Sequence, residues 1–326
     1  MKTLVTGGSG FIGTTLVDVL LRQGEEICNL DIAEPNEKSH RTFWRQCNIL
    51  DRDSLQKEFG EFQPVHVIHL AARTDTWPHL RVEDYKVNTE GTANLLEMIQ
   101  ESESVLRFVH TSTQYVLKPG RVPQHDEDYD PHTAYGESKV IAERLLRAAN
   151  LRCLWTIIRP TNIWGPWHPR YPHEFWHVLS RGLYFHPSGK PVFRCYGYVG
   201  NVVFQIQQIL RAPAEVVDRK VFYVGDRPIS LLDWVSGFAR ALTGKDARVV
   251  PRTFLRLLAW FGDACLLLGI KFPIYSSRLQ SMTEEYLTHM EPTMSAFGEP
   301  PYSLEAGIQE TARWLQREGY VRRVYI

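Results

Sequence analysis

Continuous apolar runs alternate with helical patterns along the first half of the chain. The runs contain few polar residues, and the stretches between them place apolar residues every three or four positions. Strands that are apolar throughout and separated by helices predict a parallel sheet covered on both faces. We expect strands at residues 2–6, 26–31, 65–72, 105–113 and 153–160, and helices at 11–23, 54–59, 87–100 and 134–149.

A glycine-rich turn, GGSGFIG at residues 7–13, joins the first predicted strand to the first predicted helix. Glycines at this spacing allow a tight turn, close approach of a ligand to the backbone, and close packing of the helix on the strand. The N-terminus of a helix presents free N–H groups and a partial positive charge, which bind phosphate. The turn therefore predicts a dinucleotide site at Gly7, Gly10, Phe11, Ile12 and Gly13.

An acidic residue ends the second predicted strand. Asp31 follows Gly13 by 18 residues, and no arginine comes directly after it. A carboxylate at this place accepts hydrogen bonds from the adenosine ribose and repels a 2′-phosphate. NAD is therefore favoured over NADP.

Tyr135 and Lys139 are four residues apart on a predicted helix, so they share one face. A phenol titrates near ~10, and a neighbouring ammonium stabilises the phenolate. We therefore expect Lys139 to lower the pKa of Tyr135 toward the range of a general acid/base. The hydroxyl residues Thr111, Ser112 and Thr113 lie at the end of a central predicted strand, where a hydroxyl group would hold the substrate oxygen.

The second half of the chain has a less regular pattern. Residues 161–198 are dense in aromatic residues, proline and histidine, and strand and helix patterns return after residue 194. The predicted fold is α/β, a doubly wound parallel sheet of the Rossmann type with a smaller mixed α/β C-terminal substrate lobe. We assign residues 1–160 to the dinucleotide-binding domain, completed by parts of 194–242. Residues 161–326 form mainly the substrate lobe, and the boundary is discontinuous.

Composition narrows the classes of partner. Hydrophobic residues make up 44% and charged residues 23% of 326 residues, and 37 Lys and Arg balance 37 Asp and Glu. These values are typical of a globular protein, and no basic excess indicates a nucleic-acid partner. Five scattered cysteines without zinc spacing, and an N-terminus unlike a signal peptide, favour a reducing cytoplasmic location.

Two further patterns have more than one interpretation. The apolar stretch 254–270 contains two charged residues and favours a buried or amphipathic helix over membrane contact or a partner surface. Residues 173–177 match the HExxH zinc motif, but Pro172 precedes them and the next histidine is wrongly spaced. We therefore predict no metal site. The aromatic residues around this motif indicate packing in a core more than stacking on a ligand.

Taken together, the motifs resemble the extended short-chain dehydrogenase/reductase superfamily and, more narrowly, the NAD-dependent epimerase/dehydratase family that acts on nucleotide sugars. The matching segments are TGGSGFIG, Asp31, HLAA at 69–72, NTEGT with Asn88, TST at 111–113, YGESK, and RPTNIWGP at 159–166.

This resemblance implies an NAD cofactor, a nucleotide-sugar substrate and often a homodimer. It implies that Tyr135 is the catalytic acid/base, Lys139 its electrostatic partner and Thr113 the active-site hydroxyl residue. Further residues that match cofactor-binding positions are Asn48, Ile49, Leu70, Ala71, Ala72 and Asn88. The residues that match substrate-binding positions are Thr113, Gln114, Asn162 and Arg194.

Several positions depart from the family pattern. Asn48 replaces an aspartate that grips adenine, and Gly200-Asn201 replaces an Asp-Asp pair. The dehydratases of the family have Asp-Glu where this chain has Gln114-Tyr115, so dehydration is not expected. A late arginine for the nucleotide phosphates has no clear match, and Arg278 is only a candidate.

The sequence thus predicts an epimerase that oxidises a secondary alcohol to a ketone and reduces the ketone again after it has rotated in the site. Two alternatives stay open. One is an NAD(P)-dependent dehydrogenase or reductase of a non-sugar alcohol or ketone, sterol-like or flavonoid-like. The other is a non-catalytic NAD-binding scaffold or sensor.

Overall fold

Seven parallel strands form the central sheet of the computed structural model, which describes residues 1–121, 123–270, 272 and 274–326. The strand order is β11-β6-β5-β4-β1-β2-β3. The strands are β1 (Lys2–Thr6), β2 (Glu26–Asp31), β3 (Trp44–Gln46), β4 (His66–His69), β5 (Arg107–Thr111), β6 (Leu154–Pro160) and β11 (Lys220–Val224). The doubly wound α/β prediction is confirmed.

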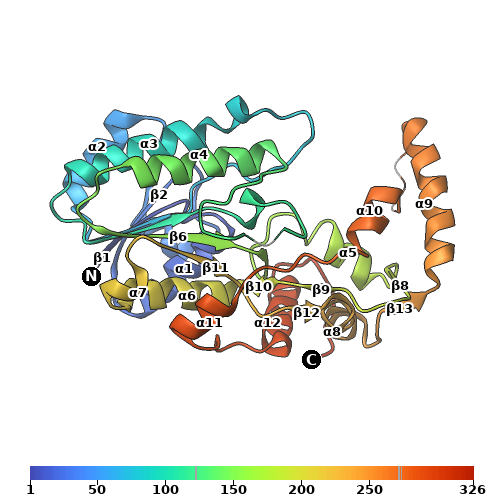
Figure 1. Cartoon of the computed structure of the whole chain (residues 1–326). Coiled ribbons are helices and arrows are strands. Elements are labelled where there is room, and N and C mark those ends of the chain that lie inside the picture. The colour runs from blue at the N-terminus through green and yellow to red at the C-terminus, as the bar shows by residue number, and fades with distance from the viewer. Residues whose placement is uncertain (122, 271, 273) are drawn as a thin grey trace. The chain divides into compact units, whose positions relative to one another are not determined.

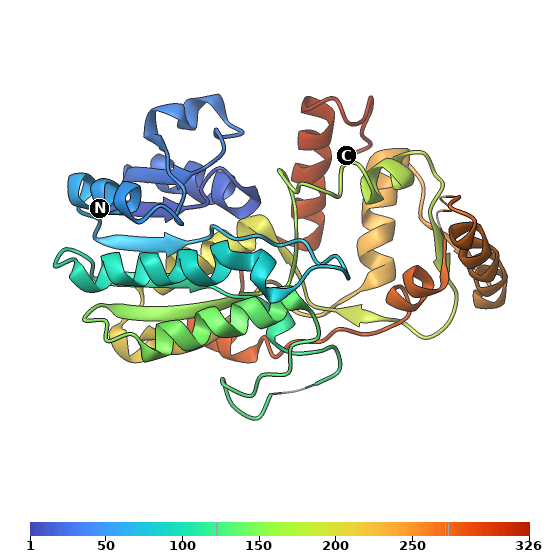
Figure 2. The ribbon, with the colours of Figure 1, turned by 90° about the horizontal axis from the view of Figure 1, so that it is seen from above.

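Helices cover both faces of this sheet (Figure 1). Helices α2, α3 and α4 lie on one face, and α1, α6 and α7 lie on the other. Figure 2 looks down on α3 and α4, which lie side by side on the sheet and run roughly along the direction of its strands. The bounds are α1 (Phe11–Arg22), α2 (Arg52–Phe62), α3 (Lys86–Glu101), α4 (Ala134–Ala148), α6 (Val199–Arg211), α7 (Ala214–Val217) and α11 (Glu291–Phe297), which packs on α6 and β11.

The strand order reverses between β1 and β4. From β1 the chain adds β2 and β3 on one side, and β4, β5, β6 and β11 on the other. Open parallel sheets bind ligands beyond the carboxyl ends of the strands at such a reversal, because the loops diverge there and leave a crevice. The glycine-rich turn after β1 and residues 70–72 after β4 both lie at this edge.

The core of the sheet explains why the apolar runs predicted strands. Leu4, Leu30, Val67, Phe108 and Ile157, from five neighbouring strands, are almost fully buried in one cluster. The predicted strands at 65–72 and 105–113 are shorter in the structure. The edge strand β3 was missed because it is only three residues long and two of them are exposed.

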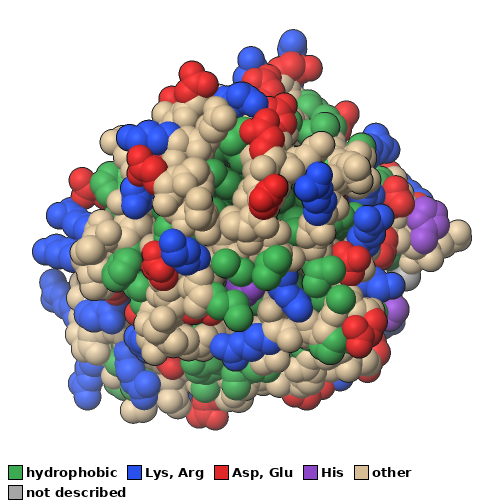
Figure 3. All heavy atoms as spheres, turned by 90° about the vertical axis from the view of Figure 1, so that its left-hand side faces the viewer, with side chains coloured by type: hydrophobic (Ala, Val, Ile, Leu, Met, Phe, Trp, Pro, Cys, Tyr) green, Lys and Arg blue, Asp and Glu red, His purple; other side chains and the backbone are tan. Residues whose placement is uncertain are grey.

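The chain divides discontinuously into two units. Unit 1 comprises Met1–Trp167, Gly197–Asp226 and Thr288–Pro301, and unit 2 comprises His168–Tyr196, Arg227–Leu287 and Tyr302–Ile326. Strand β7 (Asn162–Trp164) pairs with β10 (Tyr196–Tyr198). The chain passes from unit 2 to unit 1 within β10, between Tyr196 and Gly197. The face viewed in Figure 3 carries positive and negative side chains interspersed with small hydrophobic groups.

Unit 2 is built around helix α8, which packs on α5 and α12. Among the described residues, no helix is long and apolar enough to cross a membrane. The elements are α5 (Phe175–Ser180), β8 (Phe185–Pro187), β9 (Phe193–Arg194), β12 (Ile229–Ser230), α8 (Leu231–Thr243), β13 (Arg248–Val250), α9 (Arg252–Leu267), α10 (Ser276–Ser281) and α12 (Leu304–Arg317).

Aromatic side chains make up much of the unit 2 core. Trp234 stacks on Phe175 at 4.9 Å and on Tyr196 at 4.7 Å, and Trp176 is fully buried. The residues of the HExxH motif do not share one helix, because α5 begins at Phe175 and His173 precedes it. No group of three or more potential metal ligands occurs among the described residues.

Candidate active site

The glycine-rich turn is packed too tightly for side chains at two of its glycines. Gly7 has a φ of +75°, and a Cβ there would lie 2.5 Å from the Ala71 nitrogen. A Cβ on Gly13 would lie 2.3 Å from the Gly7 oxygen. These glycines let the α1 N-terminus approach β1 and β4 closely. Among the described residues, no side chain caps this N-terminus, so its amides suit a phosphate ligand.

Asp31 lies beside this turn. One carboxylate oxygen accepts a hydrogen bond from the Ser9 amide at 3.0 Å, and the other accepts one from the Ala33 amide at 3.0 Å. The Asn36 side chain donates to the Ser9 oxygen at 2.8 Å. The structure thus brings Asp31 to the turn, as the ribose-binding prediction requires. The sequence analysis did not single out Asn36, which lies in a loop without a motif.

The remaining predicted cofactor positions lie after β3 and β4, at the same edge of the sheet. The Leu70 amide donates to the Thr6 oxygen at 2.9 Å, and the Ala71 amide lies against Gly7. These two contacts hold the loop after β4 against the glycine-rich turn. Ala72 follows in the same loop. Asn48 accepts a hydrogen bond from the Leu50 amide at 3.1 Å. Ile49 is buried against Gly91 of α3.

The predicted catalytic residues meet at the carboxyl end of β5. Tyr135 and Lys139 lie on α4 and are buried. The Thr113 hydroxyl interacts with the Tyr135 phenol and also accepts a hydrogen bond from the Tyr115 amide at 3.2 Å. A Cβ on Gly136 would lie 2.3 Å from the Tyr115 oxygen, so Gly136 allows the loop bearing Thr113 to approach α4.

The protonation of this pair differs from the sequence-based prediction. Burial raises the pKa of Tyr135 to about 12, and the hydrogen bond with Thr113 opposes that rise. Burial lowers the pKa of Lys139 to about 8, opposed by the charge of Glu143. The Lys139 ammonium donates to the Thr111 oxygen at 2.8 Å. The expected lowering of the Tyr135 pKa by Lys139 is therefore not found, because desolvation of the phenol dominates.

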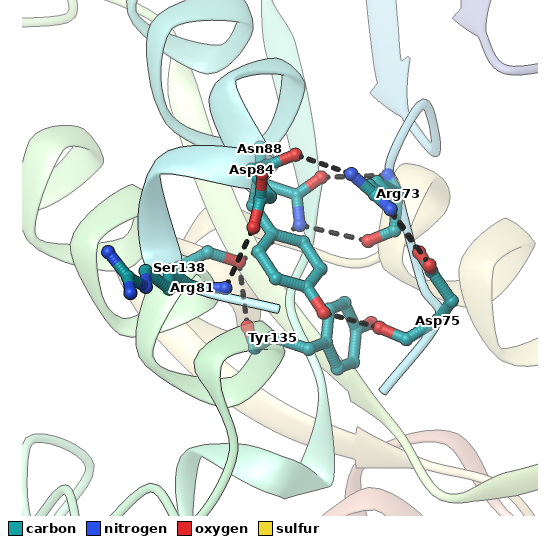
Figure 4. Close-up of polar contacts among 8 residues, drawn as sticks. Arg73, Asp75, Arg81, Asp84, Asn88, Tyr135 and Ser138 are labelled. Carbon is teal, nitrogen blue, oxygen red and sulfur yellow. Dashed lines mark hydrogen bonds and ion pairs between the residues drawn. The ribbon is translucent and has the colours of Figure 1, made fainter. Parts of the chain in front are cut away.

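Asn88 ties α4 to the loop that follows β4 (Figure 4). Its side-chain oxygen accepts from the Arg73 amide at 2.8 Å, and its nitrogen donates to the Arg73 oxygen at 3.0 Å and to Ser138 Oγ at 2.9 Å. Ser138 Oγ in turn donates to the Tyr135 carbonyl oxygen at 2.7 Å. Asn88 is therefore a positioning residue for the backbone of the Tyr135 turn.

The same loop is stiffened by an ion pair. The Arg73 guanidinium donates to both oxygens of Asp75, at 2.8 and 3.0 Å (Figure 4). It also lies 5.4 Å from the centre of the Tyr85 ring, whose hydroxyl donates to the Asp75 backbone oxygen at 2.5 Å. The Tyr85 ring is 6.1 Å from the Tyr135 ring, so this loop borders the predicted catalytic tyrosine.

A buried ion pair that the sequence analysis did not identify lies close to the predicted catalytic residues on α4. Arg159 on β6 donates to both oxygens of Glu143 on α4, at 2.9 and 2.8 Å, and both side chains are at most 1% exposed. Glu143 also accepts hydrogen bonds from Ser112 Oγ at 2.5 Å and from the Tyr129 hydroxyl at 2.9 Å. This cluster fixes the segment before Thr113 against α4.

The predicted substrate residues fall into two groups. Gln114 and Asn162 lie in unit 1, and Gln114 Oε1 accepts a hydrogen bond from Thr288 Oγ1 at 3.3 Å. Arg194 lies in unit 2, where its guanidinium donates to the backbone oxygens of Ser281 and Glu284. Those bonds occupy Nε and one terminal nitrogen, which weakens the expectation that Arg194 binds a diphosphate.

The fold and this edge of the sheet together define a nucleotide-cofactor enzyme of the doubly wound α/β class with a Thr-Tyr-Lys site. Residues 3–225 match the NAD dependent epimerase/dehydratase family. The chain belongs to that family and is therefore an NAD-dependent enzyme of the extended short-chain dehydrogenase/reductase type.

Individual relatives span several substrates. The chain is 26% identical over 330 residues to an N-acetyl-alpha-D-glucosaminyl-diphospho-ditrans,octacis-undecaprenol 4-epimerase of Escherichia coli O157:H7, covering 96% of this chain and 95% of the relative. It is 26% identical over 266 residues to a 3-beta-hydroxysteroid dehydrogenase of Mycolicibacterium neoaurum, covering 77% and 71%.

Solved structures share the fold. UDP-glucuronic acid 4-epimerase from Bacillus cereus, in complex with UDP-glucuronic acid and NAD, superimposes with a TM-score of 0.73 at 19% identity, covering 98% of this chain and 100% of that chain. UDP-glucose 4-epimerase from Thermotoga maritima, with UDP-glucose, gives 0.71 at 22% identity, covering 98% and 99%.

Proposed function

We propose that this enzyme is an epimerase that inverts a secondary alcohol of a sugar activated through a diphosphate, with nucleotide sugars as the first candidates. The observation that carries the proposal is the meeting of Thr113, Tyr135 and Lys139 at the same edge of the sheet as the glycine-rich turn. Relatives that are named for 4-epimerisation of such sugars support it.

The residues at the turn fit the cofactor. The uncapped α1 N-terminus beyond Gly10 would bind the pyrophosphate, and the Asp31 carboxylate would accept hydrogen bonds from the adenosine ribose. When bound, NAD would supply the acceptor and then the donor of a hydride.

Tyr135 would move the substrate proton at its phenolic oxygen. With a pKa of about 12 the phenol is protonated at neutral pH, which suits donation to a ketone oxygen during re-reduction. Oxidation of the alcohol requires the phenolate, so the pKa of Tyr135 must fall from about 12 when cofactor and substrate bind. Lys139, one turn along the same face of α4, would supply a cation for that shift. The Thr113 hydroxyl would orient the substrate oxygen, and burial of all three groups excludes water from the proton transfer.

A second candidate is oxidation of a hydroxyl group on a non-sugar ring. Two observations favour it: the resemblance to a hydroxysteroid dehydrogenase, and the hydrogen bonds that engage Arg194 within unit 2. In this reaction NADH accumulates with product instead of being re-oxidised in the same site.

The decisive experiment incubates the purified enzyme with UDP-hexoses and with hydroxysteroids, and follows epimer formation and NADH separately. Epimer formation without net NADH supports the proposal, whereas stoichiometric NADH from a steroid supports the second candidate. Bound NAD without turnover on any member of the panel would instead support the non-catalytic scaffold.

Tyr135→Phe tests the assignment of the proton-transfer residue. We expect turnover to fall by about 10²–10⁴-fold, because the phenolic proton is lost, while NAD binding measured by calorimetry is kept. Tyr302→Phe, at an exposed position in unit 2, is the matched control. Full activity of Tyr135→Phe would remove this residue from the mechanism.

Homodimer formation and a cytoplasmic location stay predictions from the sequence.

A further inference from the structure

Helix α9 in unit 2 has two apolar faces, of which only one is covered. Leu255 and Ala259 are buried in a cluster with Leu279 of α10. On the helix circumference the other face covers about 140° at 100° per residue. Five residues of this face and Leu268, which directly follows the helix, make up what we call the α9 outer face. They are between 48% and 90% exposed: Phe254, Leu257, Trp260, Phe261, Leu267 and Leu268.

This outer face is unusual for a protein surface in water. Single exposed apolar side chains are normal, but six large ones in one stripe mark a surface that binds a partner. The small hydrophobic groups interspersed with charges in Figure 3 show the ordinary pattern of a protein surface. A partner with an apolar surface of its own would displace water from the α9 outer face, which favours binding.

The charges around α9 point to an anionic partner. Between residues 245 and 285, which include the turn that lines the groove beside α9, the sequence has six Lys or Arg and four Asp or Glu, although the whole chain has equal numbers of both signs. Asp246 is paired with Arg240, and Asp263 accepts hydrogen bonds from the Ser276 amide at 3.0 Å and its hydroxyl at 2.5 Å. Both aspartates therefore already have partners within unit 2.

Two arginines of α9 line a groove beside the outer face. The groove has a volume of about 400 Å³ and is lined by Arg252, Arg256 and Trp260 of α9 and by residues of α10 and the following turn. Arg252 donates to Thr283 Oγ1 at 3.3 Å, and the Glu284 carboxylate accepts from Gln280 at 2.5 Å. Guanidinium groups next to an indole ring and an apolar stripe match a phosphate headgroup next to acyl chains.

We propose that α9 is an interfacial helix through which the protein binds the surface of a bilayer that contains anionic phospholipid. Helices of this kind lie in the membrane plane, with aromatic and leucine side chains at the acyl boundary and Lys or Arg at the headgroups. A symmetric contact between two copies is disfavoured, because it would bring the same cationic segment against itself. The inference does not depend on the proposed function.

The test is cosedimentation of the full-length protein with phosphatidylglycerol vesicles and with phosphatidylcholine vesicles, at low and high salt. We expect binding to phosphatidylglycerol that weakens with salt, and little binding to phosphatidylcholine. Trp260→Ser and Leu267→Asn remove exposed apolar side chains and should each weaken partitioning roughly tenfold. Arg256→Gln should weaken it about fivefold.

Two control variants remove an exposed indole ring and an exposed cation from unit 1. Trp77→Ser and Lys57→Gln, both at exposed positions, should leave vesicle binding unchanged. Absence of binding to phosphatidylglycerol at low salt, or equal binding by Trp260→Ser and the unchanged protein, would overturn the proposal. So would a dimer, seen in sedimentation velocity without lipid, that Leu257→Asn dissociates, because the outer face would then be an interface between copies.

Discussion

Lys139 offers a direct test of how strongly Tyr135 and Lys139, the proposed catalytic pair, are desolvated. Its ammonium is almost fully buried, and burial lowers its pKa from 10.5 to about 8. In the unfolded chain the same lysine holds its proton up to about pH 10.5. Between these values the unfolded state binds more protons than the folded state, so the free energy of unfolding rises with pH.

The size of the effect follows from that difference. At pH 7 the charged lysine costs roughly 3 kcal/mol of stability, and at pH 10 it costs about 1 kcal/mol. Lys139→Met removes this charge at similar volume and loses the hydrogen bond to the Thr111 oxygen, worth about 1 kcal/mol. The variant should therefore unfold at higher urea than the unchanged protein at pH 7, and its advantage should shrink by about 2–3 kcal/mol by pH 10.

Urea unfolding at pH 7, 8, 9 and 10, followed by tryptophan fluorescence, measures this difference. Lys57→Met, on the exposed side of α2, is the matched control, and its curve should run parallel to that of the unchanged protein. A stability difference between Lys139→Met and the unchanged protein that stays constant from pH 7 to pH 10 would refute the reasoning. The ammonium would then be solvated, and its contact with Thr111 would carry no electrostatic cost.

Three further predictions concern the groups around the site. Glu143→Gln leaves Arg159 as an unpaired buried charge and should cost about 3–5 kcal/mol in urea unfolding; a loss below 1 kcal/mol would mean that water reaches the pair. Gly7→Ala should cost about 1–3 kcal/mol and weaken NAD binding in calorimetry, whereas Gly60→Ala, where a Cβ meets open space, should gain about 0.5–1 kcal/mol. Asp31→Ser should reduce the preference for NAD over NADP by about tenfold, and an unchanged ratio of the two dissociation constants would place the discrimination elsewhere.

The sequence was sufficient for features that local spacing specifies. The fold class follows from apolar runs of strand length, and the phosphate-binding turn follows from glycines whose Cβ atoms would collide with Gly7 and Ala71. Tyr135 and Lys139 share a face because helical spacing alone puts them there. The edge strand β3 lacked such an apolar run, because two of its three residues are exposed to solvent.

Only the tertiary structure decided the environments of those residues. The pKa values of Tyr135 and Lys139 depend on how completely the fold removes water from them, which no spacing in the sequence expresses. The pairing of Glu143 with Arg159 joins residues on different elements, and the exposure of α9 depends on which of its two apolar faces finds a neighbour. Local pattern therefore determined the kind of site, and long-range packing determined its electrostatics and its surfaces.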